Sequence, residues 1–328
     1  MQTLRKLTPA FKRALEAFGL VMAVVILNFL LIQMAPGDPV EVIVGEMGGA
    51  SEELIAQLRQ QYGLDQPVLH QLGIYLGKVL TGDLGYSYYF NTPVLDLLLQ
   101  RVPATVLLCL SALFVAVLVG TFAGAFSARR PDGAGSHIVT VISLVGYSAP
   151  VFWIGMMLLI LFASVWPIFP VAGMQSLRKP SGIAYYLDIL HHLVLPTITL
   201  AMIYIAYYSR LARTSMIEVL GQDYIRTARA KGLPENKVIW KHALRNGLIP
   251  IVTMVGLQFG QLFAGAVLVE TVFNWPGLGR LAYESILRRD YPTLLGILLF
   301  SAVLVMIANL LTDIAYRRID PRMRKART

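Results

Sequence analysis

The sequence predicts an all-α integral membrane protein with about six transmembrane helices. Hydrophobic residues make up 56% of the 328 residues, and charged residues make up only 14%, whereas a soluble domain usually carries about 25% charged residues. Several apolar runs exceed the roughly 18 residues that mark a membrane span. The mean hydropathy of +0.63 agrees with a chain whose main solvent is lipid.

Six segments are apolar and long enough to cross a bilayer as helices, which satisfy their own backbone hydrogen bonds. They are residues 17–36, 103–127, 137–166, 192–209, 247–269 and 292–313. The third is long enough to tilt or to kink at Pro150, and the fourth is short and interrupted by Pro196. The first segment follows basic residues, as a signal peptide would, but no small-residue cleavage site follows it. We therefore expect an uncleaved first span.

The distribution of Lys and Arg predicts the orientation. Six spans place the N-terminus, the 128–136 turn, the 210–246 loop and the C-terminal tail on one side, which carries 20 of the 28 basic residues. The positive-inside rule makes this side cytoplasmic. The net charge of +9 fits this membrane topology better than nucleic-acid binding, because no motif that reads DNA or RNA is present.

This topology divides the chain into four parts. They are a cytoplasmic N-terminus with the first span (1–36), an extracytoplasmic loop or subdomain (37–102), a five-helix core with a cytoplasmic loop at 210–247 (103–313), and a basic cytoplasmic tail (314–328). Within the outer loop, Ser51-Glu52-Glu53 predicts the start of an amphipathic helix, and Pro67 to Leu80 predicts another.

The loop between the fourth and fifth spans is the most informative stretch. Pro234 suits the first position of a helix, and Glu235 suits its first turn, where the helix dipole favours an acid. Gly247 suits the position that terminates a helix. The sequence therefore predicts a helix of about three turns over residues 234–246.

This predicted helix has two different faces. Residues spaced by four share a face, and three basic side chains have that spacing: Lys237, Lys241 and Arg245. Val238, Ile239 and His242 lie on another face. The pattern leaves two interpretations open, a surface helix that touches lipid phosphates and a helix that docks in a groove on a cytosolic partner.

Other candidate residues carry weaker signals. Tyr147, Ser148 and Trp153 flank Pro150 and suit either a polar passage or ordinary packing between helices. Glu270 lies at a span end, where exposure to water is the ordinary explanation, and it gains interest only if it faces a pathway.

Two further patterns have structural explanations. Gly120-x-x-x-Gly124 is typical of close helix packing. His191 and His192 are adjacent rather than at helical ligand spacing, so we expect no metal site there.

The motifs resemble those of one protein family. Tyr224-Ile-Arg-Thr-Ala-Arg-Ala-Lys-Gly232, followed by His242-Ala-Leu-Arg-Asn246 and Pro250, resembles the EAA-type loop of bacterial ABC importer permeases. The resemblance is strongest to the B-type subunit of the dipeptide/oligopeptide/nickel family. Further matching motifs follow in order along the chain: Ala35-Pro-Gly-Asp-Pro39, Gly63-Leu-Asp65, Gly82-Asp-Leu-Gly85, Gly146-Tyr-Ser-Ala-Pro150, Trp275-Pro-Gly-Leu-Gly279 and Asp320-Pro321.

The resemblance implies a type I importer fold and a non-catalytic subunit in the bacterial inner membrane. This subunit would form half of a translocation pathway for short peptides, together with a second, related permease. Two ATP-binding subunits would hold ATP and Mg, so this chain would bind no cofactor, in line with its lack of a G-x-x-x-x-G-K-[S/T] loop. An extracytoplasmic binding protein would deliver the substrate. On motif position alone, Asp83 and Glu270 are expected to meet that protein.

The resemblance also implies that a coupling helix transmits ATP-driven motion to the spans. The residues it assigns to coupling are Arg226, Ala228, Arg229, Lys231, Gly232, Pro234, Glu235, Val238, Lys241, His242, Arg245 and Asn246. Tyr147, Ser148, Pro150, Trp153 and Glu270 are the candidates for the pathway.

Alternatives to peptide transport remain at this point. The same family motifs accompany nickel complexes, glutathione and other small solutes. An ion-coupled transporter or an intramembrane enzyme would need titratable or catalytic groups inside the spans. The predicted spans contain almost none, and no His-Glu pair occurs, which favours energy supplied from outside the chain.

Overall fold

The computed structural model describes residues 9–34, 44, 51–53, 55, 66–87, 89–178 and 180–319. Most of the helix predicted to start at Ser51 lies outside these residues. The motifs at 35–39, 63–65 and 320–321 lie outside them as well.

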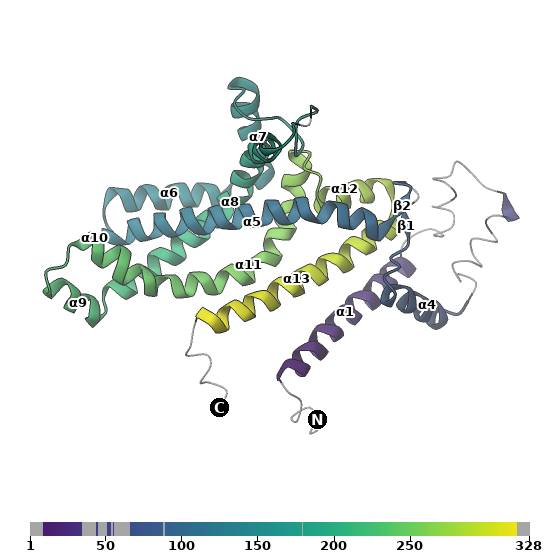
Figure 1. Ribbon diagram of the computed structural model, residues 1–328, viewed down its shortest axis with the longest axis horizontal. Helices are drawn as coiled ribbons and strands as arrows, with labels where there is room; N and C mark the ends of the chain where they lie inside the picture. Colours follow the sequence, from purple (N-terminus) through teal and green to yellow (C-terminus); the bar gives the residue numbers. More distant parts are fainter. Residues whose placement is uncertain are drawn as a thin grey trace. The chain divides into compact units, whose positions relative to one another are not determined.

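The described chain is almost entirely helical (Figure 1). Its α-helices are α1 Pro9–Met34, α4 Val68–Leu80, α5 Val94–Arg129, α6 Ala134–Ser148, α7 Val151–Leu159, α8 Ile183–Leu220, α9 Asp223–Ala230, α10 Glu235–Lys237, α11 Leu244–Val272, α12 Leu278–Arg288 and α13 Tyr291–Ile319. Two π-helical turns, Ile160–Val165 and Val238–Ala243, follow α7 and α10. Strands β1 Tyr86–Ser87 and β2 Thr92–Pro93 pair as an antiparallel hairpin. Helix α4 confirms the helix predicted over 67–80.

The chain divides into two compact units, the first formed by residues 1–102 and 281–306 and the second by residues 103–280 and 307–328. In the first unit, the Asn28 side chain of α1 donates to the Leu295 carbonyl of α13 at 3.1 Å. Asp290 precedes α13 and accepts hydrogen bonds from the hydroxyls of Ser87 (2.5 Å) and Thr293 (2.6 Å). Because its side chain also accepts from the Thr293 amide at 3.3 Å, Asp290 caps α13 and ties it to the hairpin.

In the second unit, α6, α7 and α11 pack against α8 (Figure 1). Helix α5 also crosses α8 closely, because a Cβ at Gly124 would overlap the Ser209 carbonyl and the Ala212 side chain. A Cβ at Gly120 would likewise overlap the side chain of Tyr208 in α8. These contacts confirm the close packing predicted from Gly120-x-x-x-Gly124.

By length and composition, three described helices can cross a membrane: Val94–Arg129, Ile183–Leu220 and Tyr291–Thr312. Two bent helix pairs raise the number of candidate spans to five, and the apolar stretch Phe18–Leu31 of α1 is shorter. These helices overlap the six segments predicted from hydropathy.

The prediction that the third span is a single kinked helix is wrong. Helix α6 ends at Ser148, α7 begins at Val151, and their axes differ by 103°. Ala149 is extended, with φ −80° and ψ 137°, because the ring of Pro150 disfavours helical geometry in the residue before it. The proline therefore breaks the helix instead of bending it.

The fourth predicted span was too short, and Pro196 does not interrupt it. Helix α8 runs for 38 residues through Pro196, which is buried. Losing one backbone hydrogen bond is tolerated because neighbouring helices pack around it, and polar residues at both ends hid the true length from hydropathy. Helix α5 likewise begins at Val94, before Pro103, and not at residue 103.

Replacing Gly124 with alanine should loosen the contact between α5 and α8. The added Cβ overlaps backbone and side-chain atoms of α8, so we expect a loss of about 1–3 kcal/mol in stability. The matched control is Gly77→Ala in α4, where nothing lies within 4 Å of a new Cβ and alanine should be neutral or stabilising by up to about 1 kcal/mol. Thermal unfolding in one detergent measures both variants, and equal midpoints would contradict this packing role.

Candidate functional site

The segment between α8 and α11 folds back on itself at a tight turn. Helix α9 ends at Ala230, and Gly232 has a φ of +75°, a left-handed conformation that glycine adopts without strain. The Gly232 amide donates to the Arg229 carbonyl at 2.9 Å, and the Lys231 amide donates to the Thr227 carbonyl at 3.1 Å. These bonds satisfy the last carbonyls of α9, so Gly232 is where the chain can reverse.

The chain then becomes helical again, but it does not form the isolated helix predicted over 234–246. Pro234 lies one residue before the first helical residue, Glu235. From Glu235, α10, the π-helical turn and α11 follow one another directly. A π-helical turn has hydrogen bonds between residues five apart, one more than in an α-helix, and such turns are frequent at functional sites.

The predicted terminus at Gly247 is also wrong, because Gly247 lies inside α11. Its small size serves packing instead: a Cβ there would lie 2.8 Å from the sulfur of Met216. The Ser215 hydroxyl donates to the Gly247 carbonyl at 3.0 Å. The glycine thus allows α8 and α11 to approach closely where the sequence pattern suggested an end.

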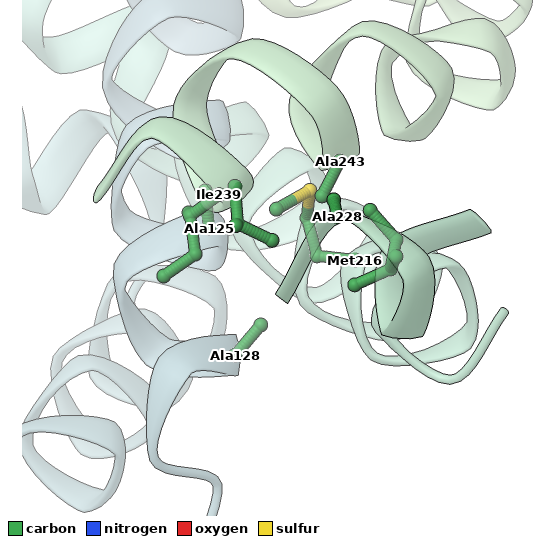
Figure 2. Packing of buried hydrophobic residues seen from close by; sticks show 8 residues of the cluster. Ala125, Ala128, Met216, Ala228, Ile239 and Ala243 are labelled. Atoms are coloured by element: carbon green, nitrogen blue, oxygen red, sulfur yellow. The ribbon is translucent and has the colours of Figure 1, made fainter. Parts of the chain in front are cut away.

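A buried apolar cluster holds this segment on the ends of two long helices (Figure 2). Its members are Ala125 and Ala128 of α5, Met216 of α8, Ile225 and Ala228 of α9, and Val238, Ile239 and Ala243 of the π-helical turn. Trp240 packs at the edge of the cluster, with its ring centroid 5.4 Å from that of Phe122 in α5. Because close-packed interiors are barely compressible, a force on this segment would reach α5 and α8 directly.

Polar contacts fix the rest of the segment. Arg229 donates to both carboxylate oxygens of Glu235, at 3.1 Å from Nε and 2.7 Å from Nη2. This hydrogen-bonded guanidinium lowers the pKa of the Glu235 carboxyl, which keeps the acid ionised. The Asn246 amide donates to the Tyr224 hydroxyl at 2.7 Å, so α9 is also tied to the start of α11.

The outer surface of the segment is basic. The exposed basic residues are Arg226, Arg229, Lys231, Lys237, Lys241 and Arg245, of which Arg229 is paired with Glu235. Val238 and Ile239 are buried and His242 is half-buried, in agreement with the two predicted faces. We call residues 223–246 the basic docking segment. It combines an apolar inner face fixed to the helices with a cationic outer face.

The candidate pathway residues lie around the break between α6 and α7. Tyr147 and Ser148 end α6, Pro150 is in the break, and Trp153 lies in the first turn of α7. All four are exposed in this chain. The Ser148 hydroxyl donates to the Leu144 carbonyl at 2.9 Å, so it is bonded within its own helix.

The expectation that Glu270 is exposed to water is wrong. Its exposed fraction is 0%, and its carboxylate accepts hydrogen bonds from the Thr105 hydroxyl (2.6 Å) and from the backbone amides of Gly279 (2.7 Å) and Arg280 (3.0 Å). Both amides belong to the first turn of α12, where a helix needs acceptors for its free N–H groups. Complete burial in this chain contradicts only the expected exposure to water, and the contact with a binding protein and the place in the pathway stay predictions.

Sequence reasoning missed the residues that complete the Glu270 site. A Cβ at Gly277 would overlap the Glu270 carboxylate, so only glycine leaves room for it. The Trp275 indole donates to the Ala104 carbonyl at 2.9 Å, and Thr105 in turn accepts from the Leu278 amide at 2.8 Å. The motif Trp275-Pro-Gly-Leu-Gly279 was the sequence signal for this site. The spacing of the motif does not show that its partner is the Glu270 carboxylate.

In the described part of the chain, no three His, Cys, Asp or Glu side chains gather as possible metal ligands. His191 Nε2 lies 2.8 Å from the Ile168 carbonyl, and His192 Nδ1 lies 2.8 Å from the Asp188 carbonyl. Both rings thus contact backbone oxygens.

Comparison with known proteins gives matches along nearly the whole chain. Residues 116–325 match the family model described as "Binding-protein-dependent transport system inner membrane component". Residues 7–109 match "Binding-prot-dependent transport system membrane comp, N-term".

Curated relatives match at 38–40% identity. The dipeptide transport system permease protein DppB of Escherichia coli (strain K12) is 40% identical over 332 residues, which cover 94% of this chain and 98% of the relative. The oligopeptide transport system permease protein AppB of Bacillus subtilis (strain 168) is 38% identical, with 95% of this chain and 98% of the relative covered. The di/tripeptide transport system permease protein DppB of Pseudomonas aeruginosa (strain UCBPP-PA14) is 40% identical, with coverages of 93% and 95%.

Among solved structures, an inward-facing conformation of the MetNI methionine ABC transporter has a TM-score of 0.55 and 16% identity, and the match covers 68% of this chain and 96% of that chain. This similarity shows that the two chains share a fold.

Proposed function

The chain belongs to the family of binding-protein-dependent transport system inner membrane components, and from that premise we propose that it forms half of the translocation pathway of an importer for short peptides. It is a non-catalytic permease subunit of an ABC importer. The peptide cargo is proposed because the relatives named above carry dipeptide, di/tripeptide and oligopeptide in their names.

The proposed assembly contains a second, related permease, two ATP-binding subunits and an extracytoplasmic binding protein. ATP and Mg are held by the ATP-binding subunits. Both termini of this chain face the cytoplasm, and the 37–102 loop faces outward, as the uneven distribution of Lys and Arg supports. The five-helix core over 103–313 surrounds the pathway.

The observation that carries the coupling proposal is the basic docking segment. Its apolar inner face packs on α5 and α8, while Lys237, Lys241 and Arg245 lie on the exposed face. An exposed helix face next to a rigid base suits docking in a groove of an ATP-binding subunit. When two such subunits close on ATP, the segment moves as one piece, and α5 and α8 move with it.

The break between α6 and α7 supports the proposed pathway position of Tyr147, Ser148, Pro150 and Trp153. Non-helical backbone at membrane depth is tolerated where it is buried in protein or lines a water-filled cavity. Aromatic and hydroxyl side chains at such a break suit contact with a peptide backbone.

Reconstitution tests the proposed function. We expect proteoliposomes that contain both permeases to hydrolyse ATP only after the ATP-binding subunits are added, and the rate should rise with the binding protein and a dipeptide. Mass spectrometry of the ligand retained by the binding protein identifies the cargo. A nickel complex or another non-peptide solute in its place would refute the peptide assignment, and transport driven by an ion gradient alone would refute an ATP-driven importer.

A further inference from the structure

The second unit contains a pocket of about 320 Å³ between α5, α6 and α8. It is lined by Ser127 of α5, by Val139, Thr140, Ser143 and Leu144 of α6, and by Ser209, Arg210 and Arg213 of α8. Among the described residues, the charged groups that line the pocket are the two guanidiniums, and none is a carboxylate. Two cations three residues apart on one helix face repel each other, which favours an anion between them.

Arg213 is held in place but is not fully satisfied. Its Nη2 donates to the Pro131 carbonyl at 3.1 Å, which fixes the guanidinium at the pocket wall. Its Nε is buried and has no hydrogen-bond partner among the described residues. A buried donor that lacks an acceptor is costly, so this atom indicates an absent acceptor.

Arg210 and the serine hydroxyls complete the set of donors. Arg210 is exposed, and its Cζ lies 5.8 Å from the centre of the Tyr147 ring. Ser143 of α6 and Ser209 of α8 also line the pocket. Guanidiniums with hydroxyls match a phosphate group, which offers several acceptor oxygens.

The location of the pocket indicates the source of that phosphate. Ser127 lies between Ala125 and Ala128, two members of the cluster under the basic docking segment, so the pocket is at the end of α5 that we place at the cytoplasmic surface. Next to it, the outer face of α6 is apolar and exposed, through Ile138, Val141, Ile142 and Val145. A charged pocket beside such a face suits a molecule with an anionic head and acyl chains.

We propose that this pocket binds the phosphate of an anionic phospholipid from the cytoplasmic leaflet. Arg213 and Arg210 bind the headgroup, and the acyl chains lie along α6. The inference depends on which side is cytoplasmic but not on the cargo of the transporter.

Native mass spectrometry of the assembled transporter, titrated with phosphatidylglycerol, tests the proposal. We expect the double variant Arg210→Gln, Arg213→Gln to bind this lipid about tenfold more weakly than the wild type. The single variant Arg210→Gln, which changes an exposed side chain and should fold normally, should fall between the two. Phosphatidylcholine should bind weakly and equally to all three proteins.

The matched control is Arg130→Gln, which removes the same charge at an exposed position outside the pocket and should bind phosphatidylglycerol like the wild type. An equal loss in this control would show diffuse surface attraction and overturn the site. Unchanged binding in the double variant would overturn it as well. If inorganic phosphate displaced the lipid at equal concentration, or if the partner permease covered α6 and no lipid stayed bound, the assignment to a phospholipid would be wrong.

Discussion

Reversing the charge of Lys241 and Arg245 to glutamate is expected to reduce ATP-driven transport at least about tenfold. Both side chains are exposed on the basic docking segment, so the chain should still fold and insert. A groove complementary to this basic face would carry acidic groups, and like charges brought together at an interface cost several kcal/mol, where each 1.4 kcal/mol is about a factor of ten in affinity. Co-purification of the ATP-binding subunits and ATP hydrolysis in proteoliposomes measure the effect.

The control for this experiment makes the same change of net charge elsewhere. Arg130→Glu with Arg178→Glu alters two exposed residues outside the segment and should leave assembly close to normal. Removal of charge in Lys241→Gln with Arg245→Gln should give an intermediate loss, because the attraction disappears without a new repulsion. Normal assembly in the charge-reversed protein would refute the docking role.

Hydropathy predicted the positions of the candidate spans, because lipid imposes a simple rule on composition. It could not predict their lengths. Helix α8 continues through Pro196 since neighbouring helices bury that proline, a tertiary effect that no local pattern contains. By contrast, Pro150 breaks its helix. Two prolines thus have opposite outcomes, one inside a continuous helix and one at a break, and the local sequence does not distinguish them.

In the basic docking segment, too, one feature could be predicted from the sequence and another could not. Spacing predicted its basic and apolar faces, because periodicity follows directly from helix geometry. The end of the helix was misplaced, since glycine has two uses that sequence does not distinguish. Gly232 adopts a positive φ and ends α9, whereas Gly247 makes room for Met216 inside α11. Gly247 was the glycine predicted to end a helix, and Gly232 is the one that does.

Glu270 was the least predictable residue of the candidate site. A carboxylate near the end of an apolar segment ordinarily faces water, and only the fold shows that α5 and α12 bring donors to it. Its acceptor oxygens bind Thr105 of α5 and two backbone amides of α12. One side chain therefore fastens α11 to two other helices.

Replacing Glu270 with alanine should strongly destabilise the protein. It leaves three donors without their acceptor in a fully buried site, and hydrogen bonds to charged groups contribute about 1.5–3 kcal/mol each. We expect a loss of at least about 3 kcal/mol, a lower yield of folded protein and a lower unfolding temperature in detergent. Glu270→Gln keeps the volume but turns an amide toward donors, so it should lie between alanine and the wild type.

The control Glu218→Ala removes an exposed carboxylate from the last turn of α8, where the helix dipole gives an acid no advantage, so its stability should stay within about 0.5 kcal/mol of the wild type. Gly277→Ala provides an independent test, because its Cβ would push the Glu270 carboxylate away from its donors. The double variant Glu270→Ala, Gly277→Ala should then lose less than the sum of the two single losses, since the added methyl group occupies space that the carboxylate has left. Strict additivity, or a Glu270→Ala protein as stable as Glu218→Ala, would show that the carboxylate does not hold these three helices together.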